Sequence, residues 1–139
     1  MKKSFLFVCH GNICRSVMAE NIFKYLTKNK YVVSSCATSL EEIGNDIYYE
    51  AKNILDKYNI PYGKHRARRI TKDDYNNYDL IICFDSFNVD NIYKITNDNS
   101  KIIKILDKDI EDPWYTRNFD KVYNEIYDGC LKLINKLGL

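Results

Sequence analysis

The sequence has few of the features that mark membrane or metal-binding proteins. Its 139 residues include only two prolines, two histidines and five glycines. No stretch approaches the roughly 20 apolar residues of a membrane span. The apolar run after Met1-Lys2-Lys3 ends before Cys9, which is too short for the core of a secretory signal. His10 and His65 are far apart, and no carboxylate–histidine spacing predicts a metal site. We therefore expect no membrane segment, no metal and no organic cofactor.

Charge and cysteine content exclude further classes. Lysine and arginine total 21 against 19 acidic residues, and a net charge of +2 does not favour a nucleic-acid partner despite the 12 tyrosines. Five cysteines is an odd number, so without an export signal we expect free thiols and a reducing, cytoplasmic location. Hydrophobic residues make up 45%, and no linker-like segment interrupts the chain. We expect residues 1–139 to form one domain.

Apolar patterning predicts strands that alternate with helices along the chain. The strands are expected at 4–8, 31–37, 79–84 and 101–106, and the helices at 17–28, 47–58, 86–96 and 119–137. This order is typical of a parallel, Rossmann-like α/β sheet of four strands with helices on both faces. Ligands of such sheets bind beyond the carboxyl ends of the strands.

The segment 9–16, CHGNICRS, lies at one of these carboxyl ends. Gly11 permits a tight bend between the first strand and a helix that begins near Ser16, so successive amide N–H groups can point at one anion. Arg15 adds a planar pair of donors that fits phosphate oxygens. We therefore predict a phosphate-binding loop made of His10, Gly11, Asn12, Ile13, Cys14, Arg15 and Ser16.

Cys9, which precedes this loop, is the candidate nucleophile. A cysteine at the end of a buried strand is by default a small core residue. Here, however, the loop amides, the helix N-terminus and Arg15 all favour the thiolate, which is the form that attacks phosphorus. Ser16 can donate a hydrogen bond to the thiolate and help it leave. Cys36, Cys83 and Cys130 have apolar neighbours in sequence, and we expect them in the core.

A second candidate segment, 107–117, follows the last predicted strand and therefore opens on the same edge of the sheet. An Asp-Pro pair is ordinarily a turn. Pro113 also biases Asp112 toward an extended backbone, which helps to aim the carboxylate into a cleft. Trp114 and Tyr115 can line a slot for a flat phenyl ring.

These segments resemble the family of low-molecular-weight protein tyrosine phosphatases. Residues 8–16 resemble its signature loop and 35–39 the exit of its second strand. Residues 65–71 resemble its basic segment, and 112–115 its acid loop. The matches occur in order and span nearly the whole chain. The resemblance implies the fold of that family and hydrolysis of phosphotyrosine in proteins, with inorganic phosphate or other oxyanions as inhibitors that bind in the loop.

The resemblance also implies a role for each site residue. Cys9 is the nucleophile that forms a phosphocysteine, and Arg15 clamps the phosphate and the transition state. Asp112 first protonates the leaving phenolate and then activates water.

The remaining roles that the resemblance implies are supporting. Asn12 is expected to hold the loop through Ser39 and His65. Cys14 is expected to form a reversible disulfide with Cys9 that protects it from overoxidation, although a plain packed thiol is the alternative. His65 has the alternative of a solvated residue in a basic stretch.

Two positions depart from the family pattern. Val17 stands where the family usually has proline, which should loosen the start of the helix slightly without removing a reacting group. Glu41 stands where the family often has an aromatic residue, so one wall of the slot becomes acidic. We expect this wall to disfavour acidic sequences beside the phosphotyrosine.

Several other functions fit parts of this pattern. A thiol-relay arsenate reductase of the same fold needs further redox cysteines, whereas residues 84–108 contain none. Phosphoarginine phosphatases have a similar loop but tend to carry threonine where Ile13 stands, which favours an aryl phosphate. A phosphocysteine carrier needs neither Arg15 nor Asp112. A silent phosphate-binding module needs no nucleophile.

Overall fold

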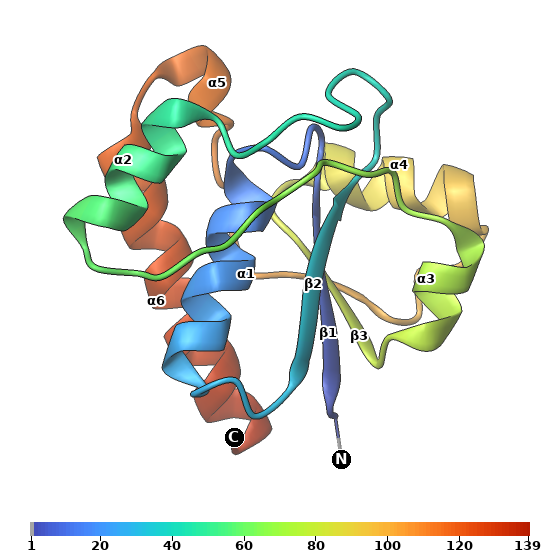
Figure 1. Cartoon of the computed structure of the whole chain (residues 1–139). Helices are drawn as coiled ribbons and strands as arrows, with labels where there is room; N and C mark the ends of the chain where they lie inside the picture. The colour runs from blue at the N-terminus through green and yellow to red at the C-terminus, as the bar shows by residue number, and fades with distance from the viewer. Residues whose placement is uncertain (1) are drawn as a thin grey trace.

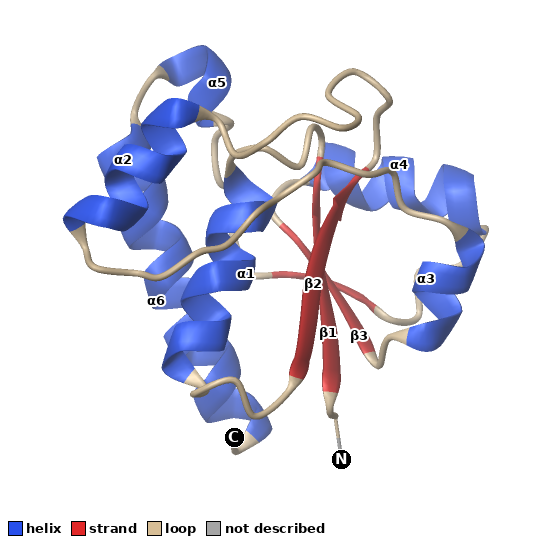
Figure 2. Ribbon diagram, in the orientation of Figure 1, coloured by secondary structure: helices blue, strands red, loops and turns tan. Residues whose placement is uncertain are grey.

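The computed structural model describes residues 2–139 and contains the predicted four-stranded parallel sheet (Figures 1 and 2). The strands lie in the order β2-β1-β3-β4. Each pair is parallel, and β1 forms the longest ladder, with six residues paired to β2. The strands are β1 (Ser4–Cys9), β2 (Val32–Ala37), β3 (Leu80–Cys83) and β4 (Ile102–Lys104). The predicted fold class is therefore confirmed.

Helices cover both faces of the sheet, as Figure 1 shows. On one face lie α1 (Arg15–Leu26), α2 (Tyr49–Lys57) and α6 (Phe119–Leu137). On the other lie α3 (Lys72–Asn77) and α4 (Ser86–Thr96). The short α5 (Pro113–Thr116) lies near the N-terminal end of α2.

β1 is buried on both faces because it is a central strand. Phe5 and Phe7 point toward α1 and α6, whereas Leu6 and Val8 point toward α3 and α4, and all four side chains are fully buried. Burial of each is worth about 1.5–3 kcal/mol. The strand that delivers Cys9 to its carboxyl end is thus fixed by core packing on two sides.

Two helices were not predicted, because neither has an apolar repeat that the sequence makes visible. α3 is six mostly polar residues, and it begins with a capping box in which Thr71 and Asp74 bond each other's backbone N–H groups. α5 is only four residues long, with Pro113 in its first turn and Asp112 as its N-cap. Among the described residues, no helix is long and apolar enough to cross a membrane.

Candidate active site

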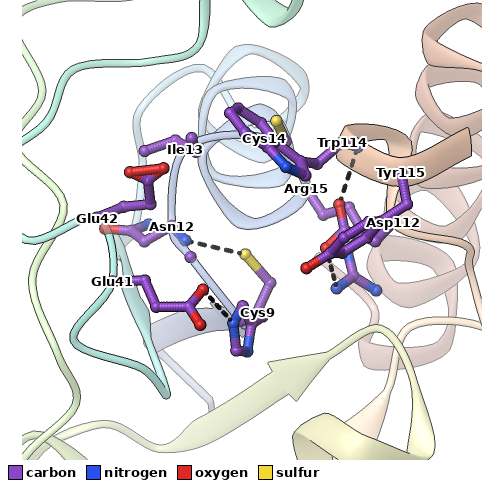
Figure 3. A pocket seen from close by; sticks show the side chains of 12 residues that line it. Cys9, Asn12, Ile13, Cys14, Arg15, Glu41, Glu42, Asp112, Trp114 and Tyr115 are labelled. Atoms are coloured by element: carbon purple, nitrogen blue, oxygen red, sulfur yellow. Dashed lines mark hydrogen bonds and ion pairs between the residues drawn. The ribbon is translucent and has the colours of Figure 1, made fainter. Parts of the chain in front are cut away.

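The segment after β1 forms a tight loop that returns directly into α1. Asn12 adopts a left-handed backbone conformation, with φ of 61°, which costs a residue other than glycine roughly 1 kcal/mol. Its backbone N–H donates to Cys9 Sγ at 3.3 Å. Cys9 Sγ also lies 3.0 Å from Ser16 Oγ, so the hydroxyl can donate to a thiolate. Two groups of the loop can therefore donate hydrogen bonds to the sulfur, and Figure 3 shows the one from Asn12.

Arg15 is 2% exposed, and its guanidinium donates hydrogen bonds to two acceptors. Its Nη1 donates to Asp85 Oδ2 at 2.6 Å and to the carbonyl of Ile110 at 2.9 Å. Burial alone would lower the pKa of the guanidinium, but Cys9, Asp112 and Asp85 outweigh burial and raise it. Arg15 thus stays charged, and its orientation is set from the segments that follow β3 and β4.

Asp112 faces this arginine from the other side of the site. Its Oδ1 accepts a hydrogen bond from the Trp114 N–H at 3.0 Å, as an N-cap does. Its Oδ2 lies 3.5 Å from Arg15 Nη2. Asp112 and Cys9 line one cavity, although 103 positions separate them in the chain. The two predicted segments therefore meet at one place.

The side chain of Asn12 holds the loop through several contacts. Its Nδ2 donates to Ser16 Oγ at 2.8 Å and to Ser35 Oγ at 2.9 Å. Its Oδ1 accepts from the backbone N–H of Arg68 at 3.3 Å. His65 Nε2 lies 2.6 Å from the Asn12 carbonyl, so the basic segment packs against the loop as a support. Because the nitrogen and the oxygen of its side-chain amide are both hydrogen-bonded, Asn12 is held in its strained backbone conformation.

The prediction that Ser39 bonds Asn12 is wrong, and Ser35 takes that place. Ser35 lies within β2 opposite Phe7, so its side chain faces α1 and the loop. Ser39 lies beyond the strand end, where its Oγ accepts from the Glu41 N–H at 3.4 Å. Ser35 Oγ also donates to Glu20 Oε1 at 2.5 Å, which extends the network into α1.

The cavity above Cys9 has an apolar wall and an acidic wall. Ile13 is nearly buried, Trp114 is 40% exposed, and Tyr115 is largely exposed on the side that α5 supplies. Across the cavity from Trp114 and Tyr115, Glu41 Oε2 lies 2.8 Å from His10 Nε2 (Figure 3). The lining residues are Cys9, His10, Gly11, Asn12, Ile13, Cys14, Arg15, Glu41, Glu42, Asp112, Trp114 and Tyr115. Apart from the supports Ser16, Ser39 and His65, every predicted site residue lines this cavity.

The five cysteines are free thiols. Burial raises the pKa of the Cys14 thiol well above its usual range, and the neighbouring Cys9 and Asp112 add to the effect. Burial likewise raises the pKa of Cys83 to about 12. Cys36, Cys83 and Cys130 are fully buried, as predicted for core residues. Residues 2–139 contain no group of histidine, cysteine and acidic side chains that could hold a metal ion.

Sequence reasoning missed several residues of the site. Asp85 orients Arg15, Ser35 and Glu20 support Asn12, and the backbone of Tyr48 donates to the Ile13 carbonyl at 3.0 Å. Only Asp85 carried a signal, because it follows β3 at the carboxyl edge where Cys9 lies. Ser35 and Glu20 lie inside regular elements, where nothing in the pattern distinguishes them.

Comparison with known proteins agrees with this site. Residues 4–138 match the family model described as low molecular weight phosphotyrosine protein phosphatase. The Gallus gallus protein named low molecular weight phosphotyrosine protein phosphatase is 36% identical, over 96% of this chain and 95% of that protein.

Solved structures give the same result. The low molecular weight protein tyrosine phosphatase SP-PTP from Streptococcus pyogenes superposes with a TM-score of 0.93 and 37% identity, over 97% of this chain and 93% of that one. The tyrosine phosphatase Wzb from Escherichia coli K30, solved with sulphate, has a TM-score of 0.90 and 26% identity, over 99% of both chains. The chain thus belongs to the low molecular weight phosphotyrosine protein phosphatase family.

Proposed function

We propose that residues 1–139 act as one phosphatase domain that hydrolyses phosphotyrosine in proteins through a phosphocysteine on Cys9. The observation that carries this proposal is the single cavity lined by Cys9, Arg15 and Asp112, with Arg15 Nη2 3.5 Å from Asp112 Oδ2. A nucleophile, an anion clamp and a proton donor are the three groups that the reaction needs.

In the first step the Cys9 thiolate attacks phosphorus. The S–P bond forms while the P–O bond to the ring breaks, and the proton of the Asp112 carboxyl moves to the departing phenolate oxygen. Arg15 and the loop amides stabilise the charge on the three equatorial oxygens. Ile13 and Trp114 flank the ring of the substrate.

In the second step water hydrolyses the phosphocysteine. The Asp112 carboxylate takes a proton from water, the water oxygen attacks phosphorus, and the S–P bond breaks. Ser16 donates a hydrogen bond to the thiolate that leaves, which restores Cys9. Orthophosphate is then released, and related oxyanions should bind in the same loop. The sulphate in the E. coli Wzb structure supports that expectation.

Turnover of a phosphotyrosine peptide in the presence of a metal chelator tests the proposal. Wild-type protein should release orthophosphate, Cys9→Ser should release none, and Asp112→Ala should be slower by about 10² or more. Phosphoarginine and arsenate, assayed in parallel, should be poor substrates. Faster turnover of either would favour the other functions of this fold, and a phosphorylated Cys9 that does not turn over would favour a carrier.

A further inference from the structure

The element that carries Asp112 has little core packing of its own. α5 is four residues long, and Pro113 is its only buried residue. Trp114 is 40% exposed and Tyr115 is 73% exposed. A general acid must nevertheless be held within a fraction of an ångström of its productive position. The acid segment therefore needs an anchor outside α5.

Arg117, the C-cap of α5, makes the contacts of such an anchor. Its backbone has φ of 62°, in the left-handed region that favours glycine and costs other residues roughly 1 kcal/mol. Its backbone N–H donates to the Pro113 carbonyl at 2.9 Å, which closes the turn. Because this backbone conformation favours glycine, the presence of arginine here points to a role for its side chain.

The side chain of Arg117 crosses from α5 to the start of α2. Its Nη2 donates to Tyr48 Oη at 3.0 Å and forms an ion pair with Glu50. Its Nη1 donates to the Trp114 carbonyl at 3.3 Å. The guanidinium carbon lies 5.3 Å from the ring centre of Tyr48 and 5.4 Å from that of Phe119. One side chain thus ties α5 to two other helices.

Tyr48 continues this connection to the phosphate-binding loop. Its backbone N–H donates to the Ile13 carbonyl at 3.0 Å, and its ring centre lies 4.8 Å from that of Trp114. Contacts therefore run from the loop through Tyr48 and Arg117 to α5, and from Asp112 back to the loop through Arg15. Removal of the Arg117 side chain leaves the ring contact between Tyr48 and Trp114 as the link between Tyr48 and α5.

We propose that Arg117 is a positioning residue that holds Asp112 and the Trp114 wall over Cys9. The inference rests on the proposed function, because it needs Asp112 to be the proton donor. It makes a specific kinetic prediction. A phenolate with a pKa of about 10, such as tyrosine, leaves only with help from an acid. A nitrophenolate is a much better leaving group and needs that help far less.

The test compares kcat/KM for phenyl phosphate and para-nitrophenyl phosphate, since this constant covers the steps up to cleavage of the ester. In Arg117→Met, kcat/KM for phenyl phosphate should fall by about tenfold, and that for the nitrophenyl ester by less than about threefold. Asp112→Asn should show the same selectivity to a larger degree. Lys132→Met, which removes a cation of α6 paired with Asp128, should change neither constant.

Two further variants keep the test valid if Arg117→Met folds poorly. Arg117→Gly relieves the backbone strain while removing the side chain, and Tyr48→Phe removes one hydroxyl acceptor but keeps the ring against Trp114. Both should lose activity selectively toward phenyl phosphate. Equal losses on the two esters, or no loss on either, would overturn the role of Arg117. If wild-type protein hydrolysed neither ester, or if Asp112→Asn showed no selectivity, the proposed function itself would fail.

Discussion

Arg15 Nη2 and Asp112 Oδ2 lie 3.5 Å apart across the cavity above Cys9. The guanidinium proposed to bind the phosphate dianion is therefore also next to the carboxyl group proposed to protonate the leaving oxygen. Asp85 Oδ2 holds Nη1 of the same guanidinium at 2.6 Å. The clamp thus has one acidic partner that orients it and a second that takes part in the proposed chemistry.

The first prediction concerns Ser35, which bonds the Asn12 side chain where Ser39 was expected to do so. Ser35→Ala removes an acceptor of the Asn12 amide and the donor to Glu20, so kcat/KM for an aryl phosphate should fall by about tenfold. The free energy of unfolding should fall by about 1–3 kcal/mol, because buried groups lose their partners. Ser39→Ala is the matched control, and steady-state kinetics should show little change in it. Equal effects of the two substitutions would contradict this assignment.

The acidic wall predicts a preference among phosphopeptides. Glu41 is exposed at the mouth of the cavity and bonds His10, and Glu42 beside it bonds Asn45. These carboxylates should repel acidic residues next to the phosphotyrosine and attract basic ones. In Glu41→Gln, the ratio of kcat/KM for basic over acidic peptides should fall by about threefold at low salt. Glu125→Gln, far from the mouth, is the control. An unchanged ratio in Glu41→Gln would show that Glu41 does not affect the preference among phosphopeptides.

The cysteine pair predicts how the enzyme responds to peroxide. Peroxide converts the Cys9 thiolate to a sulfenic acid, and the Cys14 thiol can condense with it to give a disulfide and water. Wild-type activity should therefore return after dithiothreitol treatment, whereas Cys14→Ser should oxidise further and stay largely inactive. Cys130→Ser, which removes a thiol buried in the core, is the control. Full recovery of the Cys14→Ser variant would show that Cys14 does not protect Cys9.

The ion pair between Arg68 and Asp74 predicts a pH dependence of stability. Burial opposes ionisation of Asp74, but hydrogen bonds from Arg68 and Thr71 outweigh it and lower the pKa of this carboxyl. A lowered pKa in the folded state stabilises the fold above the unfolded pKa, near 3.9, and this contribution is lost as the pH falls through the folded value.

Urea unfolding of Asp74→Asn measures this effect. Because Arg68 is partly exposed, the loss at neutral pH should be only about 1 kcal/mol, and the difference from wild type should shrink below about pH 4. Asp73→Asn, at an exposed position of the same helix, is the control. A difference that persisted unchanged at low pH would rule out this ion pair as its source.

The main features of the fold and of the site could be predicted because they depend on local pattern. Continuous apolar runs such as 5–8 identify strands buried on both faces, and parallel strands bring their carboxyl ends to one edge. That rule placed the Cys9 loop and the segment 107–117 at one edge, and the resemblance to the family then singled out Asp112 within that segment. Helix α6 was predicted with its observed bounds, because its apolar residues recur at helical spacing over 19 residues.

The rest could not be predicted, because it depends on contacts between side chains distant in sequence. Ser35 and Ser39 are four positions apart, so the alternation of a strand does not distinguish them. Only the observed end of β2 and its pairing with β1 show that Ser35 contacts Asn12. Arg117 lies at the end of a helix too short to have a periodic signal, and its partners Tyr48 and Glu50, at the start of α2, are more than 60 positions away. Such residues become visible only when the packing is known.

Trapping of the covalent intermediate is the sharpest test of phosphoryl transfer to Cys9. The protein is mixed with an excess of para-nitrophenyl phosphate, quenched within milliseconds, and digested for mass spectrometry. We expect one added phosphoryl group on the peptide that contains Cys9, with Cys9 as the modified residue. The trapped fraction should be larger in Asp112→Asn, which lacks the base for hydrolysis. A phosphoryl group on any other residue, or turnover of the ester with Cys9 replaced by serine, would contradict it.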